Sequence, residues 1–436
     1  MWKSGLILLS ISTSIFAAFL CEKGKLLMTV TGETVDPGQT YRQICGFLQD
    51  WQGVWQRPAL RAWPESLESY PSPWLSQVAA LPPDRQWLLD SGRDYSVLPA
   101  GACRQFFRDA AALAGGHDPQ PEQELRGPLL HGIRPKKAHE LARILPLLQR
   151  LRRQVPFHRV VDYAAGAGHL SRLVAATLEL PVQSVDRDAR LQEKGQGLLR
   201  RVPAADVCFH RLDLLEESPL PGRAGDTLSL GLHTCGPLAL AQIRQALAAG
   251  CPALLNFSCC YTALAPADLN LSASAGGSPA PGWNAFALDL ATRTQHGLSL
   301  PQFRLRRRVS LYRNSLHLLL TERYPDQAPP VRVGDQPARA YGQGFAAWAR
   351  GRFAALGRDD CPPDAELSAF YRRPDIRQMA GRIFAANIIR SRFGRLLELT
   401  LLLDRCLWLQ EQGRRVRLFP LFDESLSPRN LALTVV

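Results

Sequence analysis

The feature that most constrains this chain is a regular alternation of short apolar runs and amphipathic helical patterns in its middle. Runs that predict buried strands lie at 158–163, 182–185, 206–212, 227–232 and 253–257. Helical patterns open this region and separate most of the runs. Repeated strand–helix units of this length indicate a parallel sheet with helices on both faces. We therefore predict an α/β, doubly wound core.

The sequence on either side of this core predicts a larger molecule with further segments. We expect a helical N-terminal domain with Trp-rich packing, a core, a flexible loop and helical cap inserted over the cleft, and two C-terminal strands that return to the sheet. Trp spacing in the first of these favours core and interhelix packing over ligand stacking. The expected boundaries are 28–125, 126–261, 262–412 and 413–436.

The first 27 residues resemble a signal peptide, because Lys3 precedes a largely apolar stretch. That stretch is short for a membrane span. Either residues 1–27 form a signal-like leader, or translation begins at Met28; we favour Met28. Ten Cys without a CxxC pair fit a reduced compartment. We therefore expect a cytoplasmic protein without stable membrane association.

The chain carries a net charge of +13, and nearly all of its basic residues are Arg. This balance has two interpretations, arginine on solvated surfaces through codon bias or an acidic partner such as RNA. The densest basic cluster comprises Arg304, Arg306, Arg307 and Arg308. Both interpretations remain open at this point.

Acidic and glycine residues follow three successive strands at the edge where an open parallel sheet binds ligands. Asp162 precedes a loop with Gly166 and Gly168, which would let a ligand approach the backbone. Asp186 ends the second strand and Asp213 ends the third. These acids suit the amino group, ribose and adenine of S-adenosylmethionine (SAM). A dinucleotide fingerprint would instead have glycine at position 171, which is Ser.

The next two strands end in residues that would face a transferred methyl group. His233 is the candidate general base, and its alternative role is to brace the strand end. Cys235, Cys259, Cys260 and Tyr261 complete this candidate catalytic set. The cysteines are interpreted as small residues lining the pocket. A metal site with His233 is the alternative; no ligand spacing supports it, and no metal is predicted.

A second polar cluster opens the helix before the first strand. Lys136, Lys137, His139 and Glu140 are candidates for contacts with the substrate or with the SAM carboxylate. Paired lysines are notable in a chain that otherwise uses arginine. Ion pairing on the first turn of a helix is the alternative interpretation.

Four strings in the sequence, PKKAHE, VDYAAGAGHLSR, GLHTCG and CCY, resemble the family of methyltransferase-like protein 25. Its relatives include ribosomal RNA adenine dimethylase domain-containing proteins, and the C-terminal LLLDRCLWLQEQG string is also similar. A shorter likeness is to tRNA 2′-O-methyltransferases of the acceptor stem. The resemblance implies a class I SAM-methyltransferase, Rossmann-like fold. It also implies SAM contacts from Asp162, Gly166, Gly168, Asp186 and Asp213.

One residue departs from the family pattern, since Ala164 stands where relatives more often have glycine. We expect a SAM-dependent methyltransferase whose favoured acceptor is RNA, either tRNA or rRNA. The alternatives are a methyltransferase of protein or small molecules, or a noncatalytic SAM-binding module. A nicotinamide-dependent oxidoreductase is less favoured. The sequence identifies no protein partner.

Overall fold

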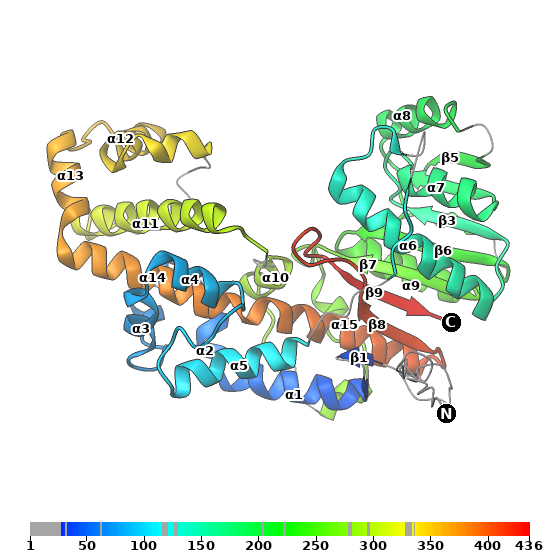
Figure 1. Cartoon of the computed structure of the whole chain (residues 1–436), viewed down its shortest axis with the longest axis horizontal. Helices are drawn as coiled ribbons and strands as arrows, with labels where there is room; N and C mark the ends of the chain where they lie inside the picture. The colour runs from blue at the N-terminus through cyan, green and yellow to red at the C-terminus, as the bar shows by residue number, and fades with distance from the viewer. Residues whose placement is uncertain are drawn as a thin grey trace, which may run out of the picture.

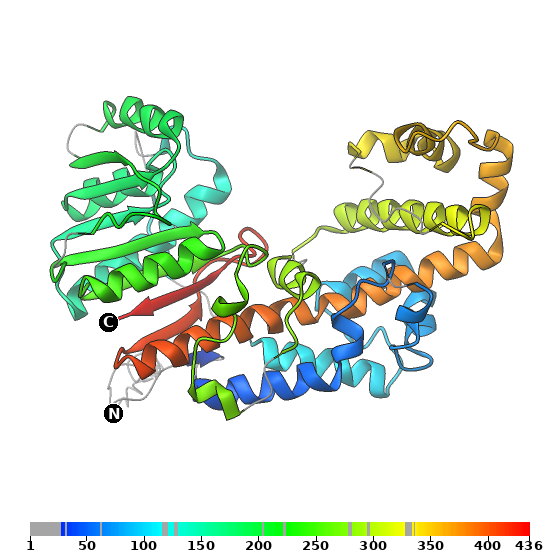
Figure 2. The ribbon, with the colours of Figure 1, turned by 180° about the vertical axis from the view of Figure 1, so that it is seen from behind.

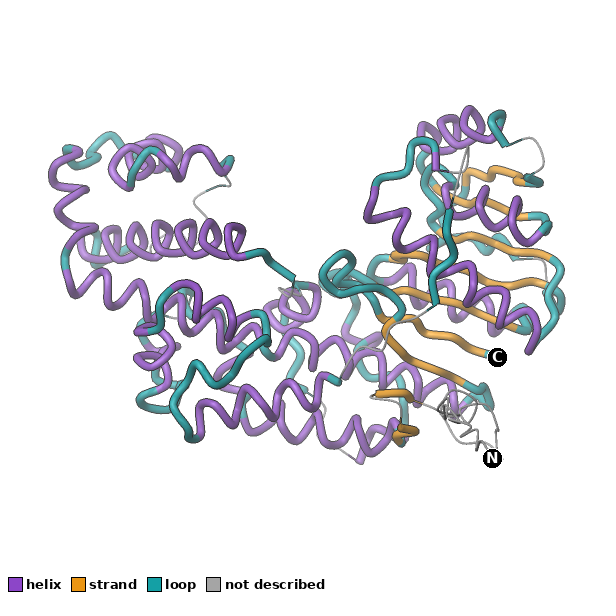
Figure 3. The backbone as a smooth tube through the Cα atoms, in the orientation of Figure 1, coloured by secondary structure: helices purple, strands orange, loops and turns teal. Residues whose placement is uncertain are grey.

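The computed structural model consists of a seven-stranded sheet with its helices and a second, helical body beside it (Figures 1 and 3). The leader expected at 1–27 lies outside the described residues. The structure describes residues 28–436 apart from 31–32, 62, 116–120, 126–129, 203–204, 221–223, 278–280, 294–296, 328–333 and 335.

The large sheet has the strand order β5-β4-β3-β6-β7-β9-β8. Its strands are β3 (Arg159–Tyr163), β4 (Val182–Asp186), β5 (Val207–Arg211), β6 (Thr227–Thr234), β7 (Ala253–Ser258), β8 (Val416–Pro420) and β9 (Leu431–Val435). Strands β3 to β7 pair in parallel, and β9 runs antiparallel between β7 and β8. This is the order of a class I Rossmann-like sheet, so the predicted fold class is confirmed.

Alternating side chains of the strands supply an apolar core to each face of the sheet, as the two-residue period of a strand requires. Val160 packs with α6 and α7, whereas Val161 and Tyr163 belong to the core that contains α9. The helices of this part are α6 (Pro135–Gln154), α7 (His169–Leu178), α8 (Ala189–Leu199) and α9 (Pro237–Ala248).

The helical body is built from both the N-terminal segment and the segment inserted between β7 and β8. Its helices are α1 (Pro37–Asp50), α2 (Gln52–Trp55), α3 (Trp74–Ala80), α4 (Pro83–Asp90), α5 (Ala102–Ala114), α10 (Ala285–Thr292), α11 (Leu300–Arg323), α12 (Phe345–Ala355), α13 (Asp364–Arg372), α14 (Pro374–Ser391) and α15 (Phe393–Glu411). A short antiparallel pair, β1 (Met28–Val30) and β2 (Glu33–Val35), precedes α1.

The two helical segments, which the sequence divides at residues 126–261, share one core in space. Aromatic side chains join them, because Phe393 of α15 contacts Phe47 and Phe106 at ring-centroid distances of 5.9 and 5.5 Å. Within the N-terminal segment, Trp51 and Trp74 lie 5.1 Å apart by ring centroids. The same core continues onto the α9 face of the sheet. The N-terminal tryptophans Trp51 and Trp74 thus serve packing.

The helical body lies on the side of the sheet toward which the parallel strands point their carboxyl ends (Figures 1 and 2). Helix α15 runs from this body to the edge strand β8 and joins the two parts. In the part of the chain that is described, no helix is long and apolar enough to cross a membrane.

The loop after Tyr261, expected to be flexible, is hydrogen-bonded to α15 at residues 271–274. Asp404 accepts backbone hydrogen bonds from Leu271 and Ser272, at 2.7 and 3.1 Å. Glu411 accepts hydrogen bonds from the amides of Ala273 and Ser274. Because both carboxylates belong to α15, this part of the loop is fastened to that helix.

Candidate active site

The turn from β3 into α7 has the backbone conformation that its glycines permit. Gly166 and Gly168 have φ of 60° and 61°, in the left-handed region that favours glycine. A Cβ on Gly168 would lie 2.8 Å from the Phe209 ring, so the position also needs a residue without a side chain. Ala164 adopts φ 53° in the same turn although it carries a methyl group.

Asp162 lies beneath this turn and is almost completely buried. Burial raises the pKa of its carboxyl to about 6, against the opposing effects of Ser171 and Lys137. The Ser171 hydroxyl donates to Asp162 Oδ2 at 2.6 Å. Position 171, where a dinucleotide loop would have glycine, therefore supplies a hydrogen bond that holds the start of α7 to β3.

The acids at the ends of β4 and β5 also bind the loops around them. Asp186 Oδ2 accepts from the Gly166 amide at 2.8 Å, and Oδ1 accepts from the Asp188 amide at 2.9 Å. Asp213 Oδ1 accepts from the Leu215 amide at 3.1 Å. Two apolar side chains near these acids are open to solvent, Leu191 at 36% and Leu215 at 48% exposure.

This donor and acceptor set fits SAM. Carboxylates at successive strand ends can accept hydrogen bonds from ribose hydroxyls and from an amino group. Leu191 reaches the glycine turn, since its Cδ1 lies 3.9 Å from where a Cβ on Gly166 would be. Exposed leucines beside the acids offer an apolar surface for a purine ring. The residues predicted from the sequence for the cofactor thus lie together at one end of the sheet.

Glu140 of α6 is the centre of the second predicted cluster. Its side chain is only 1% exposed, and its Oε1 bonds to His233 Nε2 at 2.9 Å. The Ser427 hydroxyl donates to the same oxygen at 2.7 Å. Lys136 and Lys137 place their ammonium groups 3.8 and 3.6 Å from the carboxylate. The structure therefore unites residues that the sequence could not connect.

The charges of this cluster depend on one another. Burial alone would raise the pKa of Glu140, but the hydrogen bond and charge of His233, together with Lys137, hold it at about 2. Burial lowers the pKa of Lys137, while Glu140 and Asp162 oppose this effect. Lys137 thus lies between two carboxylates, one in each predicted cluster, and links the glycine turn to the end of β6.

His233 itself has an unusual backbone, with φ 62° at an irregularity in the β6–β7 pairing between Leu232 and Thr234. Irregularities of this kind change the direction of a side chain at the end of a strand. The strained conformation turns residue 233 out of the alternation of β6, and its imidazole reaches Glu140. Backbone strain held in place by packing is common at functional sites.

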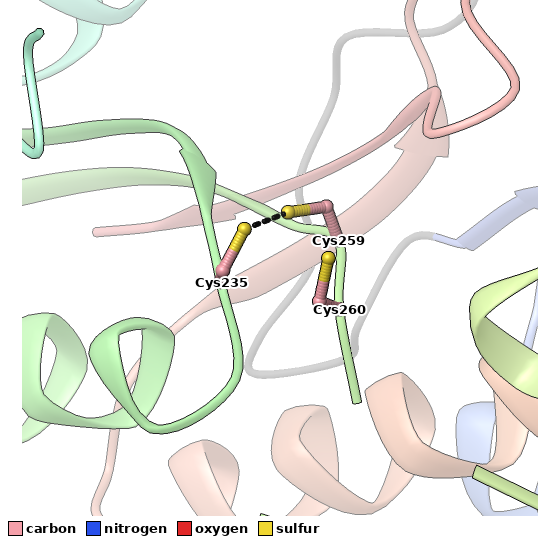
Figure 4. Close-up of side chains that lie close together, drawn as sticks. All are labelled: Cys235, Cys259 and Cys260. Atoms are coloured by element: carbon pink, nitrogen blue, oxygen red, sulfur yellow. Dashed lines mark hydrogen bonds between the residues drawn. The ribbon is translucent and has the colours of Figure 1, made fainter. Parts of the chain in front are cut away.

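Three cysteines gather at the carboxyl ends of β6 and β7 (Figure 4). Cys235 Sγ lies 2.8 Å from Cys259 Sγ, and the Sγ atoms of Cys235, Cys259 and Cys260 all lie within 4.8 Å of one another. We call these three residues the thiol cluster. Hydrogen bonding from Cys259 lowers the pKa of Cys235 to about 6, despite the opposing effect of burial.

Two residues of the predicted site face elsewhere. Tyr261 is buried, and its hydroxyl donates to Glu398 of α15 at 3.1 Å, a contact that joins the sheet to the helical body. His139 Nε2 accepts from the Asp423 amide at 3.1 Å, and Nδ1 bonds Arg143. The bond from the Asp423 amide ties His139 to the β8–β9 loop.

A buried polar chain supports the ends of β6 and β7, and sequence reasoning missed it. Asn256 donates to Thr234 Oγ1 and to Gln242 Oε1, at 2.9 and 2.8 Å. Ser258 donates to Asn256 Oδ1 at 2.8 Å, and Arg405 of α15 donates to Ser258 at 2.7 Å. The one available signal was the charged pair Asp-Arg inside the otherwise apolar run LLLDRCL.

Comparison with known proteins agrees with this geometry. Residues 136–267 match the sequence profile of a family described as a methyltransferase domain. Among solved structures, the chain is similar to TrmN from Thermus thermophilus, with 24% identity over 32% of this chain and 44% of TrmN and a TM-score of 0.22. It is also similar to coclaurine N-methyltransferase bound to N-methylheliamine and SAH, with 11% identity over 73% of this chain and 90% of the other and a TM-score of 0.25.

The match spans less than half of the TrmN chain, and both TM-scores lie far below 0.5. The fold class consequently rests on the strand order and on the family match. Residues 136–267 contain β3 to β7, the glycine turn, both acidic strand ends, His233 and the thiol cluster. They make up the methyltransferase domain that the family match identifies, and the residues whose geometry fits SAM lie within it.

Proposed function

We propose that this methyltransferase modifies RNA, and that the helical body binds the phosphate backbone of the acceptor. The observation that carries the proposal is a cavity of about 820 Å³ between α3, α11, α13 and α14. Four arginines line it and no acidic residue does. We call it the arginine groove, formed by Arg307, Arg372, Arg377 and Arg382.

The guanidinium groups of this groove lack carboxylate partners. Within the described part of the chain, none of the four forms an ion pair. Neighbouring arginines behave differently, since Arg373 pairs with Glu322 and Asp375, each at 2.7 Å. Uncompensated positive charge lining a concave surface attracts a polyanion, and guanidinium groups suit phosphate geometry.

Buried polar atoms in the groove also lack partners. Ser315 lines the groove with 1% exposure, and its hydroxyl has no hydrogen-bond partner, as is true of Arg382 Nε. Such atoms are costly to leave unsatisfied. The Arg304–Arg308 cluster of the sequence contributes only Arg307 to the groove, because Arg306 pairs with Asp90 at 2.7 Å.

In the sheet domain, the residues at the start of α6 and the end of β6 suit proton removal from an acceptor. SAM supplies an electrophilic methyl group. In the neutral form of His233, an Nε2 hydrogen donated to ionised Glu140 leaves Nδ1 as the proton-accepting nitrogen. Glu140 fixes the orientation of the imidazole through this bond, so we assign to His233 the removal of the acceptor proton.

The test combines an assay of the acceptor class with variants of the groove. Radiolabelled SAM is supplied to the purified chain with total nucleic acid and protein from cells lacking the gene. Label that RNase removes and protease does not supports an RNA acceptor. Label that only protease removes would contradict an RNA acceptor. Absence of label from both the nucleic-acid and the protein fractions, although SAM still binds, would also contradict it.

The groove is tested by Arg377→Gln combined with Arg382→Gln. We expect weaker RNA binding and a shallower dependence of affinity on salt, by about one unit of log–log slope for each phosphate that the variant no longer binds. Arg350→Gln combined with Arg244→Gln is the matched control, because both arginines are exposed and already pair with Asp364 and Asp268, at 2.8 and 2.9 Å. An equal weakening in the control variant would show that net charge alone, rather than the groove, binds RNA.

A further inference from the structure

The thiol cluster has the composition and geometry of a metal site that the sequence does not indicate. Its residues come from two strand ends 24 positions apart, so no short ligand motif exists. Among the described free cysteines, these three form the one group close enough to hold an ion jointly. We propose that Cys235, Cys259 and Cys260 bind a thiophilic divalent cation, Zn²⁺ in the first instance.

Distances in the cluster are compatible with a shared ion. Tetrahedral zinc with Zn–S bonds of about 2.3 Å separates its sulfur ligands by about 3.8 Å. The Sγ atoms of the cluster lie between 2.8 Å, for the Cys235–Cys259 pair, and 4.8 Å from one another. Small side-chain rotations would therefore place all three at bonding distance from one ion. The side chains converge on a common point in Figure 4.

The backbone around the cluster is built for close approach. Gly236 follows Cys235 with φ 55°, and a Cβ on it would lie 3.4 Å from the Cys260 carbonyl oxygen and 3.2 Å from Ala263. A larger residue would separate the two strand ends. Beneath them, the hydrogen bonds of Asn256 fix Thr234 and Ser258, the residues that directly precede Cys235 and Cys259. The sulfur ligands are thus carried by a rigid support.

The ionisation of the cluster agrees with ligand chemistry. The thiolate is the form of cysteine that binds metals. Cys235 is the member whose pKa is lowered, whereas the neighbouring thiols and burial raise the pKa of Cys259. Binding of Zn²⁺ would release the protons that remain on the other thiols. The isolated buried cysteines differ, since burial raises the pKa of Cys103 to about 12.

Three protein ligands leave the fourth position of a tetrahedral ion open. Structural zinc sites are usually closed by four protein ligands, whereas three ligands with an open position are typical of reactive sites. Cys235 is exposed, so water or a substrate atom can reach this position. The inferred site lies beside His233 but does not depend on its role in methyl transfer.

The experiment measures metal in the full-length chain, purified under reducing conditions, stripped with chelator and reloaded with zinc. We expect one zinc ion per chain in the wild type after desalting. Cys235→Ser and Cys259→Ser should lower zinc affinity at least tenfold. Cys208→Ser is the matched control, because Cys208 is an exposed thiol on β5 outside the cluster, and it should retain full zinc content.

A second readout keeps the test independent of variant folding. Cobalt loading of the wild type should produce a thiolate-to-cobalt charge-transfer band, which zinc displaces. The proposal would be overturned if the stripped wild type bound neither metal while all three thiols reacted with a thiol reagent. It would equally be overturned by a Cys235–Cys259 disulfide that persists in the reduced, active protein.

Discussion

Ala164 occupies the left-handed backbone region in the glycine turn, with φ 53°. For an L-residue with a Cβ this conformation costs roughly 1–2 kcal/mol. Ala164→Gly removes that cost but adds about 0.4–1 kcal/mol of unfolded-state entropy. We expect a net stabilisation of about 0.5–1 kcal/mol, measured by urea unfolding. Ala165→Gly is the control, since its φ is not positive, and it should destabilise the fold.

The same substitution tests whether the Ala164 methyl narrows the cofactor site. If it does, Ala164→Gly should also lower the Kd for SAM, measured by calorimetry. Equal affinity in both forms would mean that the methyl group faces away from the cofactor. Equal stability of the wild type and the Ala164→Gly variant would argue that the turn carries no strain.

Glu140 predicts a pH dependence of stability. Its folded-state pKa of about 2 lies below the ordinary 4.5, so the ionised carboxylate stabilises the fold above pH 4.5. This contribution, about 3 kcal/mol, is lost as the pH falls from about 4.5 toward 2. Glu140→Gln should destabilise the chain at neutral pH, and its difference from the wild type should shrink across that window in urea unfolding. A difference that is constant with pH would contradict the assignment.

At the scale of residues, the sequence predicted the positions of side chains that directly follow a strand. Asp186 and Gly166 are examples, because the carboxyl ends of parallel strands meet at one edge. The Glu140–His233 pair joins residues 93 positions apart, and no local pattern encodes that contact. Tyr261 was expected in the catalytic set, but its hydroxyl faces Glu398 because its environment is set by α15, which the sequence could not position.

Among the structural elements, β6 and β7 share a chain of buried hydrogen bonds, and one glycine leaves room for it. A Cβ on Gly231 would collide with Gln242 Oε1, the atom that accepts from Asn256. Gly231→Ala should therefore displace Gln242, break the buried chain and cost roughly 2–3 kcal/mol by overpacking and broken hydrogen bonds. Urea unfolding measures this destabilisation.

The control for this prediction is Gly197→Ala in α8. Nothing lies within 4 Å of its Cβ position, and the residue is exposed in a helix. Alanine should stabilise that helix by up to about 1 kcal/mol. If both substitutions had the same effect, steric crowding at Gly231 would not be the cause, and the polar chain would tolerate a side chain there.

The strand and helix pattern of the core was predictable because each element buries a face with its own period. The sequence placed strands at 182–185 and 253–257, and β4 and β7 are found at Val182–Asp186 and Ala253–Ser258. The loop after Tyr261 was not predictable in the same way. Its composition suggests mobility, but its fixed position depends on Asp404 and Glu411, which follow more than 130 residues later.

This docking predicts that Glu411→Gln loosens the loop. Glu411 accepts from two backbone amides and two serine hydroxyls, and an amide side chain cannot accept all of them as well as a carboxylate. Hydrogen exchange at the Ala273 and Ser274 amides should become faster. Glu366→Gln, on α13 outside this contact, is the control and should leave exchange unchanged. Fast exchange in the wild type would instead support a mobile lid.

At the scale of the whole molecule, segments that the sequence divides into separate domains share a single apolar core. The helices before and after the sheet share one apolar core, and this core continues to the α9 face of the sheet. Helix α15 spans the junction, where Glu398 binds Tyr261 and Arg405 binds Ser258. Neither helical segment could bury its apolar surface alone, so we expect the sheet and the helical body to unfold as one unit.

The distribution of tryptophan allows a direct test of this coupling. All nine Trp residues lie outside 136–267, whereas the residues predicted to bind SAM lie within that range. A ligand that binds only the folded state adds about 2.7 kcal/mol at a hundred times its Kd. If unfolding is cooperative, SAM at a hundred times its Kd should raise the free energy of unfolding by this amount when unfolding in urea is followed by tryptophan fluorescence. The shift should vanish in Asp186→Ala, which removes a predicted SAM contact, and persist in Glu193→Ala, an exposed acid of α8. A tryptophan transition indifferent to SAM, together with an intact SAM affinity, would show that the helical body unfolds separately from the catalytic domain.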